Sequence, residues 1–202
     1  MNAEASDMGA DVPAGELRFN FRSGRLCLAF VATVGERWRG RYERLREPSD
    51  LARWYCEAGL LQEPPDVTRS GLESARVLRE AVHRLARAVL AGQAPSPADE
   101  AAVNAAAAAP PLVPVLSGGT GRLALPAARG QQAALSTVAR DAVDLFSGPA
   151  AARLRACASP ECALLFVDTS RPGRRRWCSS EACGGKDRAA AYRRRRAGIP
   201  EG

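Results

Sequence analysis

The sequence of 202 residues is long enough for one medium-sized domain and a small second module. Its hydrophobic content of 46% is ordinary for a globular protein, and no apolar run approaches the roughly 18–20 residues that cross a bilayer, which argues against a membrane protein. The formal net charge is +7, but residues 1–152 carry seventeen basic and seventeen acidic residues, whereas residues 153–196 carry twelve and four. The excess positive charge therefore belongs to the C-terminal segment, as in a surface that binds phosphate.

The start of the chain, MNAEASDMGADVPAGE, lacks the basic and apolar regions of a secretory signal. We therefore expect a cytoplasmic protein whose cysteines are reduced. One lysine stands against twenty-eight arginines and alanine is abundant, which indicates a GC-rich bacterial source. Residues 1–15 show no apolar periodicity and are expected to be disordered.

Alternation of Leu17, Phe19 and Phe21 with polar residues predicts a short strand. Apolar residues then recur at every fourth position from Leu26 to Trp38, which predicts a helix. The charge-dense segment 35–47 is either a loop or a solvated extension of that helix.

Two helices are expected next. Ser49 is placed to cap a helix that Gly59 ends, and an apolar stripe predicts a long helix over residues 68–91, closed by Gly92. His83, the only histidine of the chain, lies beside this stripe and is interpreted as a structural or surface residue. Cys27 and Cys56 lie on apolar helical faces and are expected to be buried thiols.

Residues 92–97 form a short linker, and Ser96 followed by Pro97 predicts the start of an alanine-rich helix that ends near residue 108. Apolar segments on both sides of the SGGTG run at 117–121 predict a hairpin. This run is not a phosphate loop, because no Gly-Lys-Ser/Thr ending and no helix follow it. Further helices are expected over 131–146 and 150–156. Residues 16–152 thus predict a mostly helical domain with a short strand and a hairpin, in the α+β class.

Four of the six cysteines form two equal pairs in the pattern C-x4-C-x15-C-x4-C, namely Cys157 and Cys162, then Cys178 and Cys183. Structural zinc sites commonly take four thiolates from two short-spaced pairs, so the pattern predicts one zinc ion per chain. The alternatives are four buried thiols or two disulfides, but this polar segment has little core in which to bury thiols.

The segment between the pairs predicts a hairpin, with strands at 163–167 and 174–177 and a turn at 168–173. A helix is expected from about residue 185 to residue 196, and Asp168 is expected to accept backbone N–H groups in the turn. The order of knuckle, hairpin and helix predicts a small treble-clef-like zinc finger over residues 153–198, folded largely by its metal.

The finger segment resembles the CGNR zinc finger. The matching pieces are the first cysteine pair, Leu165 to Ser170 as "LFxDxS", Arg175 to Cys178 as "RRWC", the second pair and a basic tail. The name-giving Cys-Gly-Asn-Arg stands here as Cys183-Gly184-Gly185-Lys186, so the cysteine and the first glycine are kept and the next two residues differ. The resemblance implies that metal binding is retained, while a contact of the missing Asn is lost.

Residues 17–150 resemble the ABATE domain, which commonly precedes such a finger in bacterial transcription regulators. The matching pieces are the opening Gly24 to Thr33, the "DLxxWxxxAGLL" helix at 50–61 and the "ARxLREAxxRL" helix at 75–85. Relatives usually carry Asp and Asn within "LDFVNT", where this chain has Ala29 and Ala32. If those polar residues bind an effector in relatives, the site is altered here.

Basic residues of the finger, with one aromatic between them, are the candidate contacts to phosphates or bases. They are Arg171, Arg174, Arg175, Arg176, Lys186, Arg188, Tyr192, Arg193, Arg195 and Arg196. The alternative for the terminal RRRR is a solvated tail. An enzyme is not expected, because four thiolates close the zinc shell and no histidine lies near it.

These features favour a zinc-finger DNA-binding transcription regulator, whose N-terminal domain senses a small-molecule effector or forms a homodimer. The alternatives are a zinc module that binds RNA or an acidic protein, and a thiol-based redox sensor.

Overall fold

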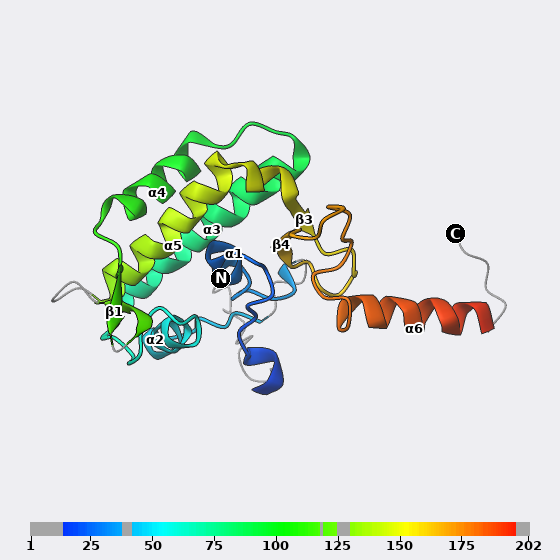
Figure 1. The fold of residues 1–202 in the computed structure, drawn as a ribbon, viewed down its shortest axis with the longest axis horizontal. Coiled ribbons are helices and arrows are strands. Elements are labelled where there is room, and N and C mark those ends of the chain that lie inside the picture. Colours follow the sequence, from blue (N-terminus) through cyan, green and yellow to red (C-terminus); the bar gives the residue numbers. More distant parts are fainter. Residues whose placement is uncertain (1–13, 38–41, 118, 125–129, 197–202) are drawn as a thin grey trace, which may run out of the picture.

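The computed structural model describes residues 14–37, 42–117, 119–124 and 130–196. A bundle of helices forms the N-terminal part, a small finger follows it, and the last helix runs away from the rest of the molecule (Figure 1). The fold is α+β and mostly helical in its N-terminal part, as the sequence predicts. The expected disorder of residues 1–15 falls almost entirely outside the described residues.

The long helix α3 (Arg69–Ala91) is the centre of the bundle and packs against α1, α4 and α5. Thr68 caps its start by accepting the backbone N–H of Gly71 at 3.0 Å, and Gly92 ends it in the left-handed conformation (φ 64°). Its buried stripe runs from Leu72 to Ala86. The predicted bounds of this helix and its end at Gly92 are confirmed, whereas the cap at Thr68 was not predicted.

The first two helices begin and end differently from the prediction. Helix α1 (Leu26–Val31) is shorter, because the chain leaves it and Val34 pairs with Glu43 in an isolated bridge; Trp38 lies outside the described residues. Helix α2 (Pro48–Glu57) is capped by Glu47 and not by Ser49. The Asp50 carboxylate accepts the N–H of Glu47 in return, which completes a capping box.

The predicted strand at 17–22 is wrong. A 3-10 helix, η1 (Ala14–Leu17), is followed by irregular chain. Phe19 lies 4.2 Å beneath the Arg53 guanidinium, and the ring of Phe21 lies 6.1 Å from that of Trp54. The alternating aromatics therefore pack on α2, and no neighbouring strand supplies a ladder for them.

The remaining elements of the N-terminal part follow the prediction. They are α4 (Pro97–Ala108), the antiparallel strands β1 (Val113–Ser117) and β2 (Thr120–Ala124), and α5 (Gly130–Ser147). Leu125, which we placed in the hairpin, lies outside the described residues. Among the described residues, no helix is both long and apolar enough to cross a bilayer.

The entry into the finger corrects two predictions. A 3-10 helix η3 (Pro149–Arg153) and the strand β3 (Leu154–Ala156) replace the expected helix over 150–156. β3 pairs antiparallel with β4 (Leu165–Val167), so the finger's strand partner comes from before the first cysteine pair and not from residues 174–177. Leu154, Leu165 and Val167 belong to the same buried cluster as the helices, so the strands of the finger complete the core of the bundle.

Candidate metal centre and basic helix

The four predicted zinc ligands meet in one place. The thiol sulfurs of Cys157, Cys162, Cys178 and Cys183 all lie within 4.8 Å of one another, and Cys162–Cys178 and Cys178–Cys183 are each 3.6 Å apart. Tetrahedral zinc with bonds of about 2.3 Å separates its sulfurs by about 3.8 Å, so the cluster has the size that zinc requires.

Backbone hydrogen bonds shape the two turns that carry the cysteines. The N–H of Cys157 donates to the carbonyl of Leu164 at 2.8 Å, and the chain turns between them through Ala163, which has a φ of 51°. On the second turn, Ser179 accepts the N–H of Gly184 on its carbonyl and the N–H of Ala182 on its hydroxyl. Each pair is therefore held by hydrogen bonds between residues of its own turn and those next to it.

The chemistry of the donor set also fits a divalent cation. The thiol of Cys178 can donate to Cys162 and lowers the pKa of Cys162 to about 5, whereas the pKa of Cys178 rises well above its usual value. Burial raises the pKa of Cys183 to about 11. The negative charge of the Cys162 thiolate thus opposes ionisation of Cys178 and Cys183. A bound divalent cation offsets this repulsion, so that all four cysteines bind it as thiolates.

A small apolar cluster surrounds the site. Ala32, at the end of α1, packs there with the cysteines, Leu164 and Phe166. Ala29 lies in the main core, and Ala29 and Ala32 are 4% and 8% exposed. The two positions where relatives carry Asp and Asn are therefore buried, and one of them contacts the finger.

Asp168 has the predicted place in the turn. It is buried, and its carboxylate accepts the backbone N–H groups of Ser170 and Arg175 at 2.9 and 2.8 Å. Hydrogen bonds from Ser170 and Arg175 hold the pKa of Asp168 at about 2. Arg153 closes the same turn by donating to the carbonyls of Asp168 and Ser170, a role that no pattern in the sequence indicated.

The arginines before the second cysteine pair differ in their surroundings. Arg175 is half-buried, donates to the carbonyl of Cys178 at 2.7 Å and lies 5.3 Å from the ring of Phe166. Its guanidinium is thus used inside the finger. Arg171, Arg174 and Arg176 are exposed, although Arg176 lies over the ring of Trp177.

Helix α6 (Cys183–Arg196) carries the other candidates and projects from the body of the molecule (Figure 1). Arg188 turns back and donates to the carbonyl of Ser180, and Lys186 lies 3.6 Å from Glu161. Tyr192 is 57% exposed, and the remaining candidate side chains on this helix are exposed as well. These are Arg193, Arg195 and Arg196.

The fold and the site define a zinc-finger protein with a helical N-terminal domain. Comparison with protein families assigns residues 24–149 to ABATE, described as a "Putative stress-induced transcription regulator", and residues 153–196 to the CGNR zinc finger. The chain belongs to the ABATE family and binds one zinc ion at its four-cysteine cluster. No curated protein matches the chain.

Proposed function

We propose that the protein is a cytoplasmic DNA-binding transcription regulator that inserts α6 into the major groove. The observation that carries the proposal is the form of this helix. It has fourteen residues, six of them basic and one acidic, and it stands away from the body of the molecule (Figure 1). A major groove about 12 Å wide admits one helix, and Arg can pair with guanine there.

The positive charge next to α6 supports a nucleic acid as the partner. Arg174 and Arg176 extend the positive charge from α6 over the adjoining turn, where they can contact phosphates. The half-buried Arg175 holds the finger together in this proposal and contributes little to DNA binding. The four thiolates fill the zinc shell, so the metal supplies structure and not catalysis.

The helical domain would be the regulatory part. A groove of about 680 Å³ opens between α3, α4 and α5, and this volume lies within the range of about 300–1,000 Å³ that is common for small-molecule sites. Its lining is rich in alanine, with Val77 60% exposed. The groove supports either an effector site or a surface for a second copy.

The test is binding of zinc-loaded protein to a random duplex library over a series of salt concentrations. We expect an enriched sequence and a steep salt dependence. Arg193→Ala with Arg195→Ala should flatten the log–log salt slope by up to about 1.8, since each phosphate contact contributes about 0.9. Arg53→Ala on α2 is the control. Sequence-blind binding, or tighter binding to RNA than to duplex DNA, would reject the proposal.

A further inference from the structure

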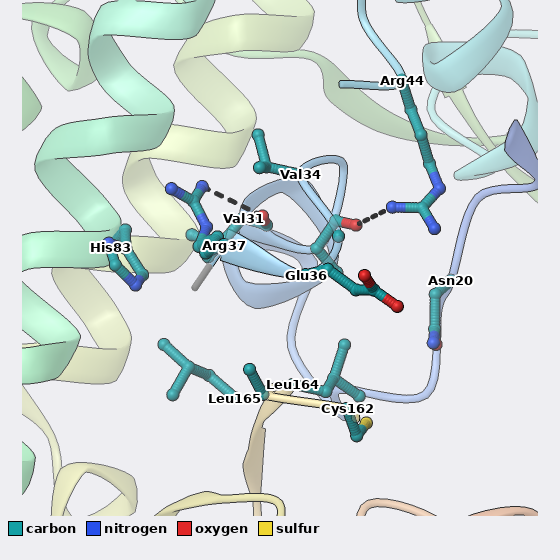
Figure 2. Close-up of a pocket in the computed structure, with 13 residues that line it drawn as sticks. Asn20, Val31, Val34, Glu36, Arg37, Arg44, His83, Cys162, Leu164 and Leu165 are labelled. Carbon is teal, nitrogen blue, oxygen red and sulfur yellow. Dashed lines mark hydrogen bonds between the residues drawn. The ribbon is translucent and has the colours of Figure 1, made fainter. Parts of the chain in front are cut away.

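A small cavity lies where the finger meets the helical domain. One wall comes from the end of α1 and the loop that follows it, at 31–37, and the opposite wall is the first cysteine turn, at 162–165. Figure 2 shows Glu36 and Arg44 on one side of this space and Cys162 with Leu164 on the other. Asn20 and His83 complete its lining.

The size of the cavity limits what can enter it. Its volume is about 70 Å³, whereas one water molecule needs about 10–15 Å³ on the same measure. Several water-sized molecules therefore fit. A drug-sized effector does not, because sites for such ligands have volumes of about 300–1,000 Å³.

One zinc ligand opens onto this cavity. Cys162 is half-buried and lines it, whereas the other three ligands are 2–8% exposed and are not among its described walls. Oxidation of a cysteine requires that the oxidant reach its sulfur, so the most exposed of the four ligands is the one open to it. That ligand is Cys162.

The cavity wall also carries hydrogen-bond donors. The guanidinium groups of Arg37 and Arg44 line it, and each donates to a backbone carbonyl at the end of α1 (Figure 2). Arg44 packs against Gly35 so closely that a Cβ on Gly35 would lie 2.7 Å from its Nη1. Arg37 also donates to both carboxylate oxygens of Glu80, at 2.6 and 3.1 Å, and Glu36 lines the same space. The two arginines therefore hold this wall of the cavity in place.

We propose that Cys162 is an oxidative modification site, which hydroperoxides reach through this cavity. The Cys162 thiolate attacks one peroxide oxygen, an S–O bond forms and the O–O bond breaks. The leaving oxygen takes a proton and departs as water or an alcohol. The sulfur loses two electrons and becomes a sulfenic acid, and the peroxide is reduced by the same two electrons.

Cys178 is positioned to complete the reaction. Its sulfur lies 3.6 Å from that of Cys162, and a disulfide requires about 2.05 Å. The Cys178 thiolate attacks the sulfenic sulfur, the S–S bond forms, the S–O bond breaks, and hydroxide leaves and is protonated to water. The disulfide removes two of the four thiolates that would hold zinc, so the finger would release the metal that keeps α6 in place.

The experiment uses the zinc-loaded full chain and hydrogen peroxide at neutral pH. A metal-indicator dye follows zinc release, and peptide mass spectrometry identifies each oxidised cysteine with time. We expect one zinc released per peroxide consumed at the cluster and Cys162–Cys178 as the first disulfide. A first disulfide without Cys162, or retention of zinc while Cys56 is oxidised, would overturn the proposal.

Two matched variants test the route of entry. Asn20→Tyr places a ring at the edge of the cavity, whereas Arg22→Tyr places the same ring on a neighbouring exposed residue that does not line it. We expect zinc release about tenfold slower in the first variant only, in proportion to the lost access. Equal rates in the two variants would reject entry through the cavity. Both readouts concern zinc and thiols, so they stay valid whether or not the finger binds DNA.

Discussion

The backbone N–H of Val167 in the finger donates to the carbonyl of Ser23, at the entrance to α1, with an N···O distance of 3.0 Å. Gly24 follows in the left-handed conformation (φ 74°), and a Cβ there would lie 3.6 Å from the carbonyl oxygen of Val167. This bond continues the β3–β4 pair onto the helical domain. Stability of the bundle and metal binding by the finger should therefore be linked.

Removal of zinc should destabilise the helical domain as well as the finger. Leu154, Leu165 and Val167 belong to the core of the bundle, and full burial of each such side chain is worth about 1.5–3 kcal/mol. Thermal unfolding followed by helical circular dichroism should show a lower Tm after chelation. Cys178→Ser should already have the low Tm and not respond to the chelator. An unchanged Tm in the chelated wild type would mean that the two parts unfold independently.

The role of β4 can be tested without touching the metal ligands. Leu165→Ala should lower the free energy of unfolding by about 2–5 kcal/mol, because it leaves a cavity where the finger joins the core. Leu116→Ala in the hairpin is the matched control, since Leu116 is 84% exposed and its change should stay within about 0.5 kcal/mol. Urea unfolding of the two zinc-loaded variants measures both values, and similar losses would contradict the shared core.

The sequence was most informative where local rules decide the structure. Gly92 ends α3 as its place in the sequence predicted, and the cysteine spacing identified the metal cluster. The sequence was misleading where the strand or side chain that a segment packs against comes from a distant part of the chain. Leu165 to Val167 pairs with residues before Cys157, and Phe19 packs on α2, neither of which a local pattern can specify.

The ion pairs of the buried Arg79 in the helical domain could not be predicted from the sequence for the same reason. The Arg79 side chain is 5% exposed, and its guanidinium donates to both carboxylate oxygens of Glu43 at 2.8 and 2.7 Å and to Glu80 at 2.8 Å. Burial alone would raise the pKa of Glu80, but hydrogen bonds from Arg37, its charge and that of Arg79 lower this pKa to about 2. The partner of Glu43 is Arg79, which is distant in the sequence. Glu80 pairs with the distant Arg37 and with its neighbour Arg79 on α3.

Arg79→Ala should therefore destabilise the protein by about 2–4 kcal/mol at neutral pH. This is less than the about 3–5 kcal/mol for a fully buried pair, because the side chains of Glu43 and Glu80 remain about one-third exposed. Glu57→Ala removes the exposed ion pair with Arg53 and should cost about 0.3–0.5 kcal/mol. Urea unfolding compares the two, and a loss for Arg79→Ala as small as that for Glu57→Ala would show that the network adds no stability.

Replacement of Asp168 should weaken zinc retention in a manner that does not depend on pH near neutrality. The folded pKa of about 2 lies below the ordinary 3.8, so the contribution of the carboxylate is fully present above the unfolded pKa and is lost as pH falls toward 2. Asp168→Asn should lower zinc affinity by about tenfold. Competition with a chelator should give the same ratio to wild type from pH 6 to pH 8. A ratio that changes over this interval would assign the effect to another group.

The two residues that differ from the family tetrapeptide can be changed without loss of the metal. Gly185 lies in the first turn of α6, its φ is not positive, and no atom lies within 4 Å of the position where a Cβ would be. Gly185→Ala should therefore stabilise the zinc-loaded finger by about 0.5–1 kcal/mol, because alanine loses less backbone freedom in a helix. Gly184→Ala is the comparison: its Cβ would lie 3.4 Å from Arg188 Nη1 and 3.5 Å from Trp177, which are ordinary van der Waals distances, so this change should be tolerated as well. Thermal unfolding and zinc content measure both variants, and loss of zinc from Gly185→Ala would mean that the first turn of α6 needs the freedom of glycine to close around the metal.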